Sequence, residues 1–139
     1  MGELIEIVFE ALGQKQTEQV YKDITGKVIC LNNIFDFTEE AEVFNVVVGK
    51  VSFSSQIETD NVHLNILRYE EKTYDIEINF DLNDVKENKL IRLEQAFYIY
   101  ASNIANRNNI KSYYAGLEPA HDEDTRFFTG NTMGPLKLP

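Results

Sequence analysis

Cysteine and proline are both scarce in this chain of 139 residues. The only cysteine is Cys30, so no disulfide can form within the chain. Cys30 lies in the apolar run KVICL, where a thiol usually packs as a small hydrophobic group, and we predict that it is buried. The first of the three prolines is Pro119, so the preceding part of the chain lacks the strongest chain breaker. We therefore expect residues 1–139 to form a single domain.

Basic side chains are also few. The chain has 13 Lys and Arg residues against 23 Asp and Glu, which gives a formal net charge of −10 and a pI near 4.6. Nucleic acids and anionic membranes both attract Lys and Arg, so we predict neither as a partner. The negative charge has two explanations. It keeps a protein soluble by mutual repulsion, or it forms a surface that meets a basic partner.

Signals for export or membrane insertion are missing from the sequence. The opening MGELIEIVFEAL lacks the basic start and long apolar stretch of a secretion signal. No uninterrupted apolar run approaches the roughly 18 residues that a membrane-spanning helix needs. We expect the protein to reside in the cytoplasm.

Alternation of apolar and polar residues predicts a β-sheet. In TYDIEINF, residues 73–80, every second residue is apolar and the residues between them are polar. NVHLNILRY, residues 61–69, has the same period, and the EEKT loop between the two segments has the length of a hairpin turn. VFNVVVGKVSFS, residues 43–54, is rich in β-branched and aromatic residues and extends the predicted sheet.

Two further segments near the N-terminus are assigned to the sheet. ELIEIVFEAL, residues 3–12, fits a strand and a helix equally well in its spacing, and we favour the strand. VYKDITGKVICL, residues 20–31, is interpreted as a hairpin with Gly26 in its turn. Later in the chain, IKSYYAGLEP, residues 110–119, is expected to be extended.

A helix is predicted over residues 84–108, where apolar residues recur at spacings of three and four. Asp84 is placed to cap its N-terminus, with Glu87 in capping-box position, and Arg107 suits the dipole at its far end. The fold class that follows is α+β: a mostly antiparallel sheet of five to seven strands, with one long helix from the C-terminal half packed on one face.

The segment YYAGLEPAHDEDTRFFTG, residues 113–130, concentrates charged groups between two aromatic pairs. As a metal site it offers one histidine with carboxylates, whereas zinc sites usually have two or more His or Cys ligands, and the calcium-loop pattern is missing. An acid/base centre at Glu118, His121 and Asp122 would define a small enzyme, which we keep as the alternative. The segment also has the composition of a turn. We predict no metal, no cofactor and no catalytic activity.

The remaining interpretation is a surface for recognition of another protein. Carboxylates gather in DFTEEAE, residues 36–42, and in EPAHDED, residues 118–124, and aromatic residues border both segments. Carboxylates steer a basic partner, and aromatic contacts supply binding energy. A self-interface in an oligomer is a further possibility. The candidate partner-binding residues are Glu39, Glu40, Glu42, Glu118, Asp122, Glu123 and Asp124.

The C-terminal motif also carries a family resemblance. A Gly-Leu-Glu-Pro segment after a helix, then a group of acids and Arg-Phe-Phe-Thr, resembles the closing motif of the small acidic immunity proteins that bacteria carry against protein toxins. The resemblance rests on the motif YYAGLEPAHDEDTRFFT, which begins at Tyr113, together with the small size, the acidity, the single-domain α+β build and the missing catalytic signatures of the chain. It implies a non-enzymatic inhibitor that binds a toxin, often a basic nuclease, one to one and covers its active site. It also implies partner-binding roles for Glu118, Asp122, Glu123, Asp124 and Arg126.

Overall fold

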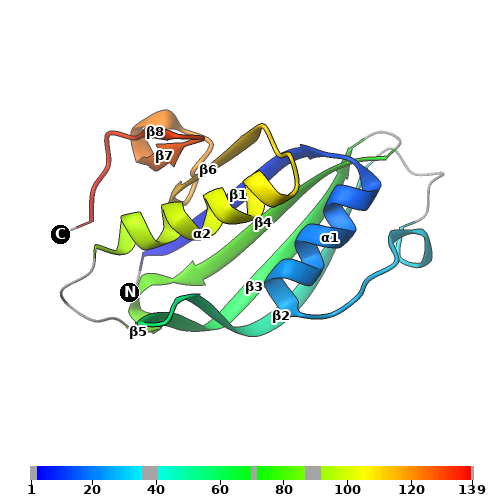
Figure 1. The fold of residues 1–139 in the computed structure, drawn as a ribbon, viewed down its shortest axis with the longest axis horizontal. Helices are drawn as coiled ribbons and strands as arrows, with labels where there is room; N and C mark the ends of the chain where they lie inside the picture. Colours follow the sequence, from blue (N-terminus) through cyan, green and yellow to red (C-terminus); the bar gives the residue numbers. More distant parts are fainter. Residues whose placement is uncertain (1–2, 36–40, 70–71, 87–91, 139) are drawn as a thin grey trace.

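The computed structural model describes residues 3–35, 41–69, 72–86 and 92–138 (Figure 1). Within these ranges the chain forms a single eight-stranded sheet, two α-helices and three short 3₁₀ turns. The elements in chain order are β1 (Leu4–Leu12), α1 (Gln14–Thr25), η1 (Leu31–Asn33), β2 (Ala41–Ser54), β3 (Ile57–Tyr69), β4 (Thr73–Asp81), η2 (Leu82–Asp84), β5 (Val85–Lys86), α2 (Leu93–Arg107), β6 (Ser112–Leu117), η3 (Glu123–Thr125), β7 (Arg126–Thr129) and β8 (Thr132–Met133).

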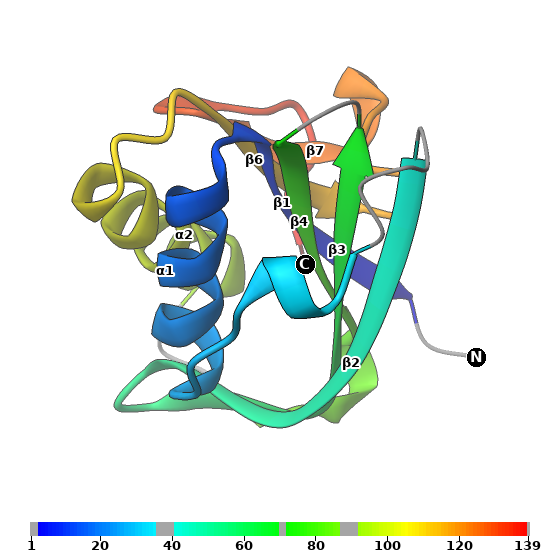
Figure 2. The ribbon, with the colours of Figure 1, turned by 90° about the vertical axis from the view of Figure 1, so that its right-hand side faces the viewer.

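The sheet order is β2-β3-β4-β1-β6-β7-β8, with β5 paired to β3, and the strand pairs between described residues are antiparallel. Figure 2 shows α1 and α2 on the same side of this sheet. The α+β class and the antiparallel sheet are therefore confirmed. The strand number exceeds the expected five to seven because β5 and β8 are short segments of two residues each.

The core fills the space between the helices and the inner face of the sheet, which we define as the face toward α1 and α2. The period-two pattern puts alternate residues there: Ile5, Ile7 and Phe9 of β1 are buried, as are alternate residues of β3 and β4. An aromatic group joins the layers, because the Phe53 ring lies 5.2 Å from that of Phe80 and 5.0 Å from that of Phe97. Burial of each such ring contributes about 1.5–3 kcal/mol.

Strand predictions based on alternation are confirmed. β3 and β4 form the expected hairpin, in which Leu64 pairs with Ile78 and Ile66 pairs with Ile76. The N-terminal segment is a strand, and residues 112–117 are extended as β6. Glu70 and Glu71 of the EEKT loop lie outside the described residues.

The predicted hairpin at residues 20–31 is wrong, because helix α1 occupies this part of the chain up to Thr25. The buried residues of α1 follow helical spacing: they are Thr17, Val20, Tyr21 and Ile24. Gly26 ends the helix with φ of 74°, and its N–H donates to the Lys22 carbonyl at 2.8 Å. Cys30 then lies in the connection that follows and is exposed, which corrects the prediction of a buried thiol.

The second helix starts later than predicted. α2 begins at Leu93 with Arg92 in the capping position, whereas Asp84 belongs to η2, so the predicted cap at Asp84 is wrong. The other predicted capping residue, Glu87, lies outside the described residues. The C-terminal end of α2 agrees with the prediction: Arg107 is the last residue of the helix, and the Asn108 side chain donates to the Ile104 carbonyl at 2.8 Å. Neither helix in the described part of the chain is long and apolar enough to cross a membrane.

Candidate functional site

The face of the sheet opposite the helices carries a row of carboxylates. We call this face of the sheet the outer face (Figure 2). The polar residues of the period-two pattern point to it: Glu6 and Glu10 from β1, Asp75 and Glu77 from β4. Strand register brings them together, since Glu6 pairs with Asn79 and Glu77 pairs with Val8. These four residues are the acidic row.

The C-terminal acidic segment lies against this row. The Ala120 N–H donates to Glu6 Oε1 at 3.3 Å, and Ala120 packs with Val8 and Tyr114 in a small buried apolar cluster. Val8 and Tyr114 are outward residues of β1 and β6 that pair with each other. The segment thereby covers the β1–β6 end of the outer face and leaves the β2–β4 end uncovered.

Arg126 holds the segment in place. Its guanidinium lies 3.9 Å above the Tyr114 ring, its Nε donates to the Ala120 carbonyl at 2.7 Å, and its NH2 donates to the His121 carbonyl at 3.2 Å. The aromatic face and the two carbonyls satisfy much of the bonding capacity of this cation. The positive charge therefore organises the loop, and the prediction that Arg126 also contacts a partner stays a prediction.

Between the acidic row and this segment lies an open hollow of about 590 Å³. Five carboxylates line it, and three of them come from distant parts of the chain: Glu6 from β1, Glu77 from β4 and Glu118 from the segment after β6. The rest of the lining is Leu4, Asn61, His63, Asn65, Asn79, Phe80, Asp81, Asp84 and His121. In the described part of the chain, no Lys or Arg forms an ion pair with these three carboxylates.

The surroundings of the carboxylates Glu6 and Glu77 raise their pKa values. Partial burial raises the pKa of Glu6, and the nearby charge of Glu118 raises it further, against the lowering effect of the Ala120 N–H and of His121. Burial also raises the pKa of Glu77, and Glu6, Asp75 and Glu118 add to the rise while a hydrogen bond from Asn65 opposes it. A cation brought to this face would relieve the repulsion and favour the ionised carboxylates.

The predicted partner-binding residues fall in different places. Glu118 lines the hollow, and Asp122, Glu123 and Asp124 are exposed in the turn that follows. Glu42 belongs to the inner face, where its Oε1 lies 3.8 Å from NH2 of the buried Arg68. Glu39 and Glu40 lie outside the described residues. Partner contact by any of these residues stays a prediction.

The aromatic residues that border the acidic segment serve the core. Tyr113, Tyr114, Phe127 and Phe128 are all buried, so they anchor both ends of the segment to the core. The same burial corrects the expectation that these rings would supply apolar contacts to a partner. Phe35, beside the first acidic segment, is buried as well.

The alternative of a metal or acid/base centre at Glu118–Asp124 gains no support from the geometry. Glu118 and His121 line the hollow with exposed side chains, while Asp122 lies outside the lining and is also exposed. The His121 Nε2 lies 3.6 Å from Asp122 Oδ1. Among the described residues, no group of three or more His, Cys, Asp or Glu side chains is arranged to hold a metal ion.

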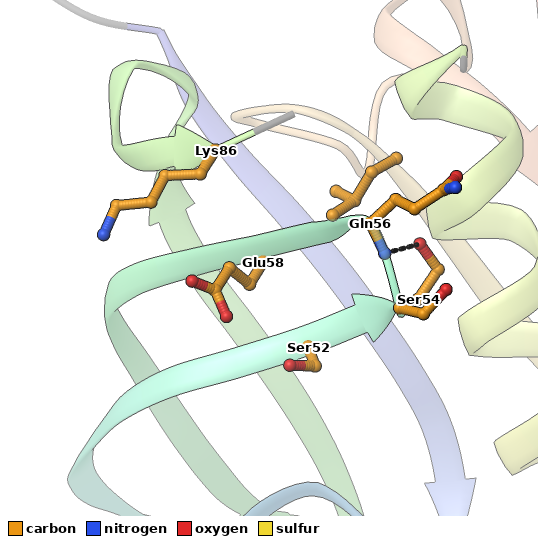
Figure 3. Close-up of a pocket in the computed structure, with 7 residues that line it drawn as sticks. Ser52, Ser54, Gln56, Glu58 and Lys86 are labelled. Carbon is orange, nitrogen blue, oxygen red and sulfur yellow. Dashed lines mark hydrogen bonds between the residues drawn. The ribbon is translucent and has the colours of Figure 1, made fainter. Parts of the chain in front are cut away.

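A second hollow, of about 690 Å³, lies at the β2–β3 hairpin, and Figure 3 shows the side chains that line it. Its charges are balanced locally: the Lys86 Nζ lies 3.1 Å from Asp60 Oδ2, and Lys50 Nζ lies 3.5 Å from Glu58 Oε1. The Ser54 hydroxyl accepts the Gln56 N–H at 3.2 Å. Both charged residues of its lining, Glu58 and Lys86, are held in ion pairs, so this hollow offers less unbalanced charge to a ligand than the acidic one does.

The acidic row was not predicted from the sequence, although one signal for it was present there. The polar positions of TYDIEINF predict a wet face that includes Asp75 and Glu77. The alternation does not predict that Glu6 and Glu10, which are distant in sequence, share that face through the β1–β4 pairing. Carboxylates dispersed along the chain thus form a denser acidic surface than the continuous acidic runs predict.

Comparisons with known proteins identify the family. The profile described as PABL017 Cdi1I immunity protein matches residues 22–133. No curated protein sequence matches the chain. A chain in the crystal structure of the toxic C-terminal tip of CdiA from Pseudomonas aeruginosa in complex with immune protein is 28% identical, with a TM-score of 0.81 over 98% of this chain and 99% of that one. The resemblance predicted from the C-terminal motif is confirmed: the chain belongs to the PABL017 Cdi1I family of toxin-immunity proteins.

Proposed function

We propose that this immunity protein neutralises a basic toxin of the nuclease class by binding it one to one through the outer face, without catalysis. The observation that carries the proposal is the acidic row beside Glu118, which has no Lys or Arg ion pair among the described residues and lies on the side without helices. The related solved structure supports a toxin partner, because its complex contains the toxic tip of CdiA.

The chemistry of nucleases supports the basic character of the partner. A protein that binds phosphate backbones does so with Lys and Arg, whose positive charge takes the place of the counterions around the phosphates. A surface with carboxylates from β1, β4 and the segment after β6 can occupy such a site in place of the nucleic acid. A nuclease toxin acts on nucleic acid inside the cell, so we place its inhibitor in the cytoplasm.

Electrostatic steering is the measurable consequence. Complementary charge raises association rates above the usual 10⁵–10⁶ M⁻¹s⁻¹ and makes them fall with salt. In water, a unit charge about 10 Å from a partner charge contributes about 0.4 kcal/mol, so removal of two charges slows association about fourfold at low salt.

The test uses the cognate toxin domain, in stopped-flow association at a series of salt concentrations. The double substitution Glu6→Gln and Glu77→Gln should slow association about fourfold and flatten the salt dependence. The matched control is Glu18→Gln with Asp23→Asn, which removes two charges from α1 on the opposite side. An association rate that does not change with salt would contradict the proposal.

A further inference from the structure

Acids alone do not explain tight binding, because charge complementarity mainly sets the association rate, whereas buried apolar contacts at the centre of an interface set the lifetime of the complex. The described residues include seven large apolar side chains that are exposed. Three of them, Val43, Val47 and Tyr69, lie together on the outer face of β2 and β3. The seven are Leu4, Val28, Val43, Val47, Tyr69, Ile99 and Met133.

Strand register makes these three side chains part of one continuous surface. Val43 pairs with Leu67, and Val47 pairs with His63. Between these two pairs lies a pair of asparagines, and Tyr69 is the next outward residue of β3. We call this surface the neutral strip, because no carboxylate belongs to it. It consists of Val43, Asn45, Val47, His63, Asn65, Leu67 and Tyr69.

The neutral strip borders the acidic row directly. Leu67 on β3 pairs with Asp75 on β4, and Asn65 pairs with Glu77. The outer face therefore has a strip without carboxylates on residues 43–47 and 63–69 of β2 and β3, beside an acidic half on β4 and β1. Protein interfaces have this composition, with an apolar centre that loses its water and charged residues beside it.

The position of the strip at the edge of the sheet strengthens the argument. β2 is the last strand at its end of the sheet, and no other described strand pairs with its outer side. Edge strands are commonly protected from unwanted association by Lys or Pro. Lys50 and the register irregularities of β2 lie beyond Val47 in the chain, whereas Val43 and Val47 themselves are 58% and 72% exposed, which is unfavourable unless a partner covers them.

We infer that the neutral strip is the apolar centre of the toxin interface, and that it receives apolar side chains of the toxin that lie beside the basic surface held by the acidic row. The inference rests on the proposed function, since it takes the same toxin as the partner. It assigns the two halves of the outer face different effects: the acidic row sets the rate of association, and the neutral strip sets the rate of dissociation.

Substitution of Val47 by glutamate separates this inference from steering alone. If charge were the whole interaction, one more carboxylate on the outer face would strengthen binding to a basic toxin. If Val47 is buried by the toxin, the new carboxylate is desolvated and the complex dissociates at least tenfold faster. Val28→Glu is the matched control, because Val28 is 82% exposed in the connection after α1 and receives the same substitution.

A milder variant guards against effects on folding. Val43→Thr with Val47→Thr keeps the β-branched shape and the strand preference of both positions while it removes apolar surface. Dissociation of the cognate toxin domain, measured by biolayer interferometry, should be about tenfold faster with an unchanged salt dependence of association. Thermal unfolding of each free variant shows that the fold is retained.

The other possible outcomes contradict either the inference about the neutral strip or the proposed function. If the wild type binds the toxin and both strip variants dissociate at the wild-type rate, the inference is wrong and the proposed function stands. If the wild type does not bind, the proposed function fails. If light scattering shows that the toxin-free chain self-associates, and that the strip variants become monomeric with unchanged toxin binding, the strip serves a second copy of the chain and the inference is wrong.

Discussion

Gly116→Ala tests whether the C-terminal acidic segment is fitted closely to the sheet. Gly116 lies in β6, where a Cβ would be 2.2 Å from the Thr125 carbonyl oxygen and 2.7 Å from the Arg126 Cα. Ordinary van der Waals contact begins at 3.4 Å, so the backbone of the segment would have to move away from β6 to accept the methyl group. Both nearest atoms belong to the backbone, which cannot turn aside as a flexible side chain can.

The expected loss of stability follows from this overlap. Added atoms in a well-packed site destabilise a protein by about 1–3 kcal/mol. The entropy of unfolding of 139 residues is about 0.3 kcal/mol/K, so Tm should fall by about 3–10 °C in calorimetry or circular dichroism. Because the segment carries Glu118 into the hollow, we also expect slower association with the toxin. Gly13→Ala is the control, since the atom nearest to its added Cβ is Gln16 Oε1 at 3.6 Å. Equal Tm values for Gly116→Ala and the wild type would refute the reasoning.

Two further predictions concern single groups. Burial, with smaller effects of neighbouring carboxylates, raises the pKa values of Glu6, Asp75 and Glu77, so the folded state holds these protons more tightly than the unfolded chain and their ionisation opposes folding. Tm should therefore rise as pH is lowered from 7 through these pKa values, and Glu77→Gln should raise Tm at pH 7 and flatten the profile. An unchanged profile would contradict a raised pKa of Glu77. The exposed thiol of Cys30 should react with a thiol reagent at a rate close to that of the unfolded chain, and protection in the native state would place Cys30 in the core after all.

Much of the sheet could be predicted because its signals are local. Alternation in residues 61–80 fixes which side of β3 and β4 is buried, and on that side Ile66 pairs with Ile76. Gly26 shows the limit of such signals. A glycine with positive φ serves a hairpin turn and a helix C-terminus equally well, and the choice depended on the packing of Val20 and Ile24 against the sheet.

The candidate site depended more strongly on contacts between distant parts of the chain. Glu118 could be identified from its motif, because it opens a short segment in which residues 122–124 are all acidic. Glu6 and Glu77 reach the same hollow only through the pairing of β1 with β4, which no local pattern specifies. Glu42 shows the opposite case. It belongs to an acidic run in the sequence, but this run does not predict that Glu42 meets the Arg68 side chain across the β2–β3 pair.

The central claim is that the toxin covers the outer face of the sheet. Carboxyl footprinting with a carbodiimide and mass spectrometry, on the chain alone and with the cognate toxin domain, measures this coverage residue by residue. The account predicts that toxin protects Glu6, Glu77 and Glu118 from labelling and leaves Glu18 and Asp23 on α1 unchanged. Protection of the two α1 carboxylates, with the outer face still labelled, would contradict it.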